Sequence, residues 1–182
     1  MSIGPLSGLM LQHMVLMNLV VPGVIYLLRP TVLSSVSKNW PLATATQLAL
    51  LWGWHSPPAL VAAMANPVVM LIMGASLTAA AAWFWLAVYA TSATGRWRAI
   101  FALLVTGKLF CLLGALLVFA PRSIFGTMMH GVEVVPLSES LADQQLAGLV
   151  MLVVCPLIYI TAGVVLASRW FLTLEAESRT DG

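Results

Sequence analysis

The sequence predicts an all-α protein, a polytopic bundle of about five transmembrane helices. Of its 182 residues, 61% are hydrophobic and only 8% are charged, whereas about a quarter of a soluble domain is charged. Apolar runs of roughly the 20 residues that cross a bilayer recur along the chain. Short segments rich in Pro, Gly, Ser and basic residues separate these runs. We therefore expect a lipid bilayer as the surroundings, and the net charge of +2 is too small to indicate a nucleic-acid partner.

The apolar runs predict spans at residues 6–28, 40–54, 67–89, 99–120 and 144–171. No Lys or Arg precedes the first run, so we interpret it as an anchor rather than a cleaved signal peptide. Pro57 and Pro58 end the second span, because consecutive prolines cannot continue a helical hydrogen-bond ladder. A short apolar piece follows, and Pro67 is suited to the first turn of the third span. The polar tail at residues 173–182 is predicted to be flexible.

Basic residues predict the orientation of the bundle, because short cytoplasmic loops carry an excess of Lys and Arg. One side of the predicted bundle carries Arg29, Lys38, Arg96, Arg98, Arg169 and Arg179. The other side carries only Arg122. The N-terminus is therefore expected outside and the C-terminus in the cytoplasm.

A stripe of soft ligands is predicted on the first span. On a helix, Met10, His13, Met14 and Met17 fall within an arc of about 100°. Thioethers together with imidazole suit Cu(I) better than Mg, Ca or Mn. Methionine also packs well in helix interfaces, so the stripe taken alone favours packing over a metal site. His13 is harder to explain by packing, because a histidine inside a span is costly without a partner.

The other two histidines are predicted at the same outer end of the bundle. His55 ends the second span, and His130 lies in the loop before the fifth span. We therefore predict a Cu(I) site formed by His13, His55 and His130, with Met10, Met14 and Met17 in support. In the alternative interpretation, His55 only caps its helix through free carbonyl groups, and His130 is solvated.

Three further polar residues are functional candidates. Lys108 lies near the middle of the fourth span, where a bare ammonium is expensive. It could be neutral, point into the bundle, or pair with Asp143 or Glu139. Asp143 is expected in the first turn of the fifth span, where an acid favours the positive end of the helix dipole. Gln144 is expected to offer its amide at the outer mouth.

The segment that begins at Asp143 also resembles a family signature. Asp143, Gln144, Ala147, Gly148 and Met151 match an Asp-Gln-x-x-Ala-Gly-x-x-Met element of the multi-span bacterial CtaG-like cytochrome c oxidase assembly factors. Further similarities follow in the family's order at Gln12–His13–Met14 with Pro22, at Trp54–His55–Ser56–Pro57 and at Phe84–Trp85. The chain resembles a divergent member, because Leu9, Met70 and Gly74 stand where the family pattern has histidines. It also resembles a shortened member, because the family usually has about seven spans and about five are predicted here.

The resemblance implies a multi-pass protein of the bacterial inner membrane that delivers copper, as a metallochaperone, to a haem-copper oxidase. Subunits of that oxidase of the respiratory chain are the expected partners, and Cu(I) is the expected metal. The missing histidines favour an alternative, a metal-free accessory subunit of a respiratory complex. A small transporter or haem-binding protein is a third and weaker hypothesis. We expect no enzyme, because the sequence contains no nucleophile–base–orienter set and no phosphate loop.

Overall fold

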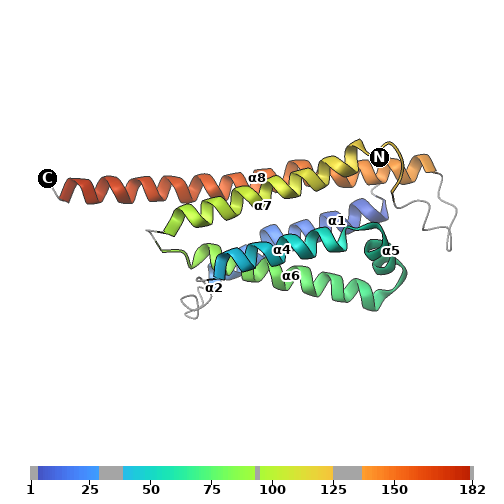
Figure 1. The fold of residues 1–182 in the computed structure, drawn as a ribbon, viewed down its shortest axis with the longest axis horizontal. Helices are drawn as coiled ribbons and strands as arrows, with labels where there is room; N and C mark the ends of the chain where they lie inside the picture. The colour runs from blue at the N-terminus through green and yellow to red at the C-terminus, as the bar shows by residue number, and fades with distance from the viewer. Residues whose placement is uncertain (1–3, 29–38, 93–94, 125–136, 181–182) are drawn as a thin grey trace.

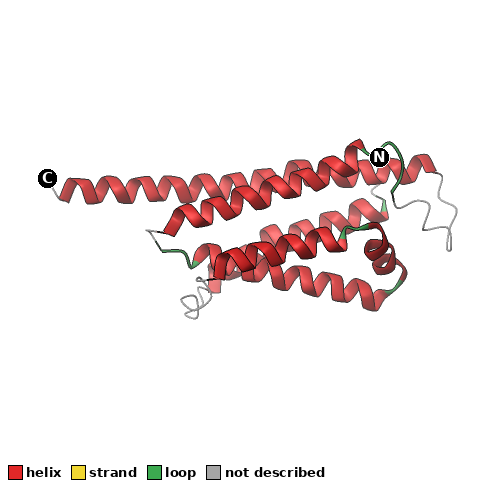
Figure 2. Ribbon diagram, viewed as in Figure 1, coloured by secondary structure: helices red, strands yellow, loops and turns green. Residues whose placement is uncertain are grey.

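The computed structural model describes residues 4–28, 39–92, 95–124 and 137–180, and its regular elements are all helices within this part of the chain (Figures 1 and 2). The first apolar run forms one continuous rod made of α1 (Pro5–Val15), the π-helix η1 (Leu16–Val20) and α2 (Val21–Leu28). The later helices are α4 (Trp40–Trp54), α5 (Pro57–Ala65), α6 (Pro67–Tyr89), α7 (Arg96–Phe119) and α8 (Leu137–Thr180). The predicted all-α class is therefore confirmed.

The helices pack side by side along one long axis (Figure 1). α7 and α8 form the most extensive helix pair. α1 packs against α8, α4 packs against α6 and α7, and α2 packs against α6. The C-terminal part of α8 continues beyond the other helices, at the end away from the N-terminus (Figure 1). One end of the bundle therefore brings together the start of α1, the end of α4 and the first half of α8.

Four helical stretches are long and apolar enough to cross a membrane: Pro5–Leu28, Pro67–Tyr89, Arg96–Phe119 and Glu139–Ala176. The expected count of five spans is not confirmed. α4 has the predicted bounds but only 15 residues, which extend about 22 Å and fall short of a hydrocarbon core of about 30 Å. α8 starts before residue 144 and is helical to Thr180, so it includes most of the predicted flexible tail. The orientation of the termini stays a prediction.

A proline explains the change of helix type in the first rod. Pro22 has no N–H to donate, and its ring crowds the carbonyl group four residues earlier, at Asn18. The wider π-turn Leu16–Val20 ends two residues before Pro22 and includes Asn18, and it absorbs this mismatch. Trp85 of α6 donates its indole N–H to the carbonyl oxygen of Met17 at 3.0 Å. The π-turn is thereby held against α6, with Met17 and Asn18 both buried.

Two glycines bring α7 and α8 into backbone contact. A Cβ atom on Gly148 would lie 2.7 Å from the carbonyl oxygen of Gly114, and one on Gly114 would lie 2.9 Å from the carbonyl oxygen of Gly148. Small residues permit such close helix packing in membranes. This contact sets the position of α8 relative to α7 at the end of the bundle where the site lies.

Candidate functional site: a histidine and methionine cavity

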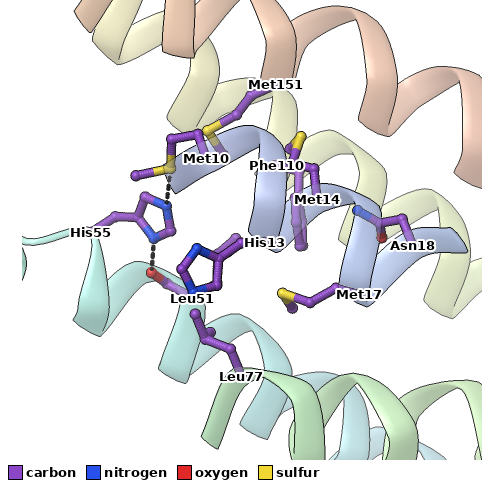
Figure 3. Close-up of a pocket in the computed structure, with 10 residues that line it drawn as sticks. All are labelled: Met10, His13, Met14, Met17, Asn18, Leu51, His55, Leu77, Phe110 and Met151. Carbon is purple, nitrogen blue, oxygen red and sulfur yellow. Dashed lines mark hydrogen bonds between the residues drawn. The ribbon is translucent and has the colours of Figure 1, made fainter. Parts of the chain in front are cut away.

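A small cavity of about 10 Å³ lies between α1, η1, α4, α6, α7 and α8 (Figure 3). This volume is about that needed to hold one water molecule, so it suits a single small ion. Its lining consists of Met10, His13, Met14, Met17, Asn18, Leu51, His55, Leu77, Phe110 and Met151. Both described histidines and four of the methionines therefore meet at one place.

His55 is held in one orientation by the end of its own helix. Its Nδ1 lies 2.7 Å from the carbonyl oxygen of Leu51. Because a carbonyl oxygen only accepts, Nδ1 carries the hydrogen, and the lone pair of the neutral ring is on Nε2. Nε2 lies 3.0 Å from Sδ of Met10 (Figure 3). The capping role expected of His55 and the contact with the methionine stripe therefore occur together.

His55 follows the last residue of α4 and lies outside the span-length helices. Burial lowers its pKa from the ordinary value of 6.5 to about 4. The hydrogen bond to Leu51 opposes this shift of the pKa, and the nearby His13 adds to it. His55 is therefore a neutral imidazole at physiological pH, with an electron pair available to a metal.

His13 repeats the arrangement from α1. Its Nδ1 donates to the carbonyl oxygen of Leu9 at 2.8 Å, which again leaves the lone pair on Nε2. A Cβ atom on Gly74 of α6 would lie 3.9 Å from this Nε2. Metal-binding histidines commonly donate their second ring N–H to a carbonyl or carboxylate group. Both rings thus have the support that ligating histidines require.

Thioethers supply the remaining soft atoms of the cavity. Met10, Met14, Met17 and Met151 are all buried, and Sγ of Cys155 lies 3.8 Å from Sδ of Met14. Among the described residues, no group of three or more His, Cys, Asp or Glu is placed to hold a metal. The methionine sulfur atoms are therefore the most numerous soft donors in the lining.

Asn18 is a lining residue that sequence reasoning missed. It is 2% exposed, and within the described part of the chain neither of its amide atoms has a hydrogen-bond partner. The available signal was a short amide side chain within an apolar run, one helical turn after Met14. Met151 was also missed as a lining residue, although it ends the Asp-Gln signature.

The structure brings together five of the six predicted metal ligands: His13, His55, Met10, Met14 and Met17. His130 and the neighbouring Met128 and Met129 lie outside the described residues. Met70, which replaces a family histidine with a soft ligand, is exposed on α6 and is not a lining residue. Metal binding itself stays a prediction.

Asp143 does not begin its own helix, because α8 already starts at Leu137. Its carboxylate instead accepts hydrogen bonds from the backbone N–H groups of Leu6, at 2.9 Å, and Ser7, at 3.1 Å. These N–H groups belong to the first turn of α1 and have no partner within that helix. A Cβ atom on Gly4 would collide with the carboxyl group. Asp143 thus caps a helix far away in sequence.

Gln144 is fully buried instead of offering its amide at the mouth. Its Oε1 accepts from the backbone N–H of Ile124 at 2.7 Å, and its Nε2 donates to the carbonyl oxygen of Leu117 at 3.2 Å. Gln145 donates to the carbonyl oxygen of Val118 at 3.4 Å. We call Asp143, Gln144, Gln145, Gly148 and Gly114 the clamp, because together they join α8 to the start of α1 and the end of α7.

Lys108 is exposed and is not among the residues that line the cavity. Within the described residues it forms no ion pair with Asp143 or Glu139. The carboxylate of Asp143 is engaged by α1. Of the roles expected for Lys108, pointing into the bundle and pairing with Asp143 are therefore wrong.

The four helices that are long and apolar enough to cross a membrane are typical of a polytopic helical membrane protein. A family model described as cytochrome c oxidase caa3 assembly factor (Caa3_CtaG) matches residues 27–173. The chain belongs to this family, which confirms the resemblance seen in the sequence. The match includes His55 and the clamp residues but begins after His13. No curated protein and no solved structure matches the chain significantly.

Proposed function

We propose that this assembly factor holds one Cu(I) ion as cargo for a caa3-type cytochrome c oxidase. Family membership supports the role in oxidase assembly, which favours a non-catalytic function. One observation carries the copper part of the proposal. The free Nε2 atoms of His13 and His55 and the thioether of Met10 line one small cavity, and both Nδ1 atoms are tied to backbone carbonyl groups.

The charge of the site supports a soft monovalent ion. The cavity lining has imidazole, thioether and amide groups, and none of its residues is acidic. Neutral thioether and imidazole ligands suit Cu(I), whereas Mg, Ca and Mn favour carboxylate, carbonyl and water. Zinc sites are typically built from Cys, His and carboxylates, and the described residues provide no group of three of these.

Binding would require a small movement of Met10. With the bond lengths of tetrahedral zinc as a guide, a nitrogen and a sulfur that share one ion lie about 3.5 Å apart. Nε2 of His55 and Sδ of Met10 are 3.0 Å apart. The methionine side chain has several rotatable bonds, so it can retreat by this amount while the two histidines stay fixed.

We further propose that the protein lies in the bacterial cytoplasmic membrane with the cavity between mid-depth and the outer surface. The excess of basic residues on the opposite side of the bundle supports this orientation. An ion held there would be accessible to oxidase subunits that receive copper at the outer side. Tagging each terminus for accessibility in intact cells tests this arrangement.

The copper proposal is tested by loading the detergent-purified protein with Cu(I) under reducing conditions, in competition with a chromogenic chelator. The wild type is expected to bind about one ion per chain, as the cavity volume allows. The double variant His13→Ala/His55→Ala is expected to bind none. Met10→Leu is expected to weaken binding, and Met70→Leu, which changes an exposed methionine, serves as its matched control.

The His130→Ala variant shows whether the third histidine adds to the site. Copper binding that is unchanged in the His13→Ala/His55→Ala variant would show that the cavity is not the copper site. A wild-type protein that co-purifies with oxidase subunits but binds no Cu(I) would favour the metal-free accessory role. The replacement of family histidines by Leu9 and Gly74 is the observation that keeps this second function in consideration.

A further inference from the structure

Lys108 lies at mid-depth of a span-length helix. α7 runs from Arg96 to Phe119, so Lys108 is about 17 Å along the helix from either end. Arg98 near one end and Arg122 just beyond the other are suited to the two interfaces. The four-carbon stem of a lysine is too short to reach an interface from this depth. Snorkelling therefore does not explain this residue.

The Lys108 side chain lies on the face of α7 that points away from the rest of the bundle. The exposed residues of α7 around it recur every four positions, at Leu104, Lys108, Leu112 and Leu116. The buried positions Thr106, Phe110 and Leu113 alternate with them and face the bundle. We call the four exposed residues the Lys108 face. It has one positive charge in an otherwise apolar surface. Intramembrane charges almost always face protein or a water-filled cavity and pair with other groups.

The part of the chain that the structure describes has no acid paired with this charge. All six acidic residues lie at or after position 133, namely Glu133, Glu139, Asp143, Glu175, Glu177 and Asp181. None therefore lies in α1, α2, α4, α6 or α7, and Asp143 is engaged by α1. A second copy that packed through the same face would place two ammonium groups together. The complementary charge must come from a different protein.

We infer that the Lys108 face is a docking surface for a transmembrane helix of another protein, one that carries an Asp or Glu at mid-membrane depth. The carboxylate pairs with the Lys108 ammonium, and the leucines on either side pack against the partner helix. This inference rests on the proposed assembly role, which supplies a membrane-embedded partner, and it does not depend on copper binding.

Site-specific photocrosslinking in cells that express the oxidase tests the docking surface. A benzoylphenylalanine residue is placed at Leu104 or Leu112, one turn on either side of Lys108. Placement at Leu71, an exposed leucine of α6, is the matched control. Adducts are expected from positions 104 and 112 but not from 71. The crosslinked peptides should map to a spanning helix with an Asp or Glu within about one turn of the adduct.

Charge variants of Lys108 then test the ion pair. Lys108→Met should reduce the crosslinking yield by at least about fivefold, because it leaves the partner carboxylate buried and unpaired. Lys108→Arg should retain most of the yield. Lys108→Glu should lose it and should regain it when the partner acid is changed to Lys. The wild-type crosslinking map decides the matter even if a charge variant fails to fold.

Four results would overturn the inference. They are adducts with lipid only, adducts with a second copy of this chain, adducts with a helix that has no acid near the contact, and an unchanged yield in folded Lys108→Met. Cu(I) binding measured on the same variants separates the two proposals. Lys108→Met should bind copper like the wild type. If the wild type binds no copper but still gives the predicted adducts, only the copper proposal is contradicted.

Discussion

The clamp and the cavity both include residues of α8, yet their carboxylate and amide groups differ in hydrogen bonding. Both carboxylate oxygens of Asp143 and both amide atoms of Gln144 have hydrogen-bond partners. In the cavity, both amide atoms of Asn18 have none among the described residues. Satisfied polar groups fix a structure, whereas unpaired ones suit a ligand. The difference separates a structural element from a candidate binding site.

Met151 connects the two regions. It ends the family signature that begins at Asp143, and its side chain lines the cavity. The clamp fixes α8 against α1 and α7, and thereby places Met151 opposite Met10 and His13. Substitutions in the clamp should therefore change stability, and substitutions in the cavity should change ligand binding.

The largest loss of stability is expected from Gly148→Ala. Its new Cβ atom would lie 2.7 Å from the carbonyl oxygen of Gly114, so α7 and α8 must separate. Overpacking of this kind costs about 1–3 kcal/mol. Gly23→Ala is the matched control, since a Cβ atom there meets nothing within 4 Å. Unfolding in detergent should show Gly148→Ala destabilised and Gly23→Ala unchanged or slightly more stable. Equal stability of the two variants would contradict the close helix contact.

Asp143→Ala is expected to lower stability by about 1–2 kcal/mol, the usual effect of losing a helix cap. The backbone N–H groups of Leu6 and Ser7 lose their acceptors, and the favourable charge at the start of α1 is lost. Glu139→Ala, at an exposed position of the same helix, is the control. Amide hydrogen exchange should speed up in the first turn of α1 only in Asp143→Ala. Unchanged exchange there would show that the cap is not formed.

Asn18→Leu should raise stability by about 1 kcal/mol, because it removes buried amide atoms without partners. It should also weaken Cu(I) binding, since Leu fills part of the cavity. Thr106→Val is the matched control, because the Thr106 hydroxyl is also buried and unpaired within the described residues but does not line the cavity. Thr106→Val should stabilise the protein and leave copper binding unchanged. A loss of stability in Asn18→Leu would indicate that Asn18 has a structural partner.

The smallest effect on stability is expected from the protonation of His55, because the ring stays neutral at neutral pH. Burial lowers its pKa to about 4, so its ring should stay neutral, with the hydrogen on Nδ1, from pH 8 down to pH 5. The unfolded chain takes up this proton near pH 6.5, so His55 lowers the stability of the fold as the pH falls from 6.5 toward 4. Nitrogen NMR of labelled histidine tests this, with His55→Ala to identify the signal. A titration midpoint near 6.5 would contradict the buried arrangement.

The helices were predictable because apolar length and proline breaks are local signals. Pro57 and Pro67 lie at the starts of α5 and α6, and α4 and α6 have the predicted bounds. The number of spans was less predictable, because α4 is apolar but short. The helical signal of α8 also continues into its polar ends, where hydropathy gives no guide.

The common location of Met10, His13, Met14 and Met17 was predictable from their helical spacing alone. The roles of Asp143 and Gln144 were not, because their partners lie more than a hundred and more than twenty residues away, respectively. No local pattern indicates which helix start a carboxylate will cap. Asn18 was missed for a related reason, since its burial depends on the π-turn before Pro22 and on the packing of neighbouring helices.

X-ray absorption at the copper edge of the Cu(I)-loaded protein tests the central claim most directly. We expect nitrogen and sulfur neighbours together around the metal in the wild type and in Met70→Leu. We expect a reduced sulfur contribution in Met10→Leu and a reduced nitrogen contribution in His55→Ala. A copper environment without sulfur, or one unchanged in both Met10→Leu and His55→Ala, would contradict the claim that this cavity is the copper site.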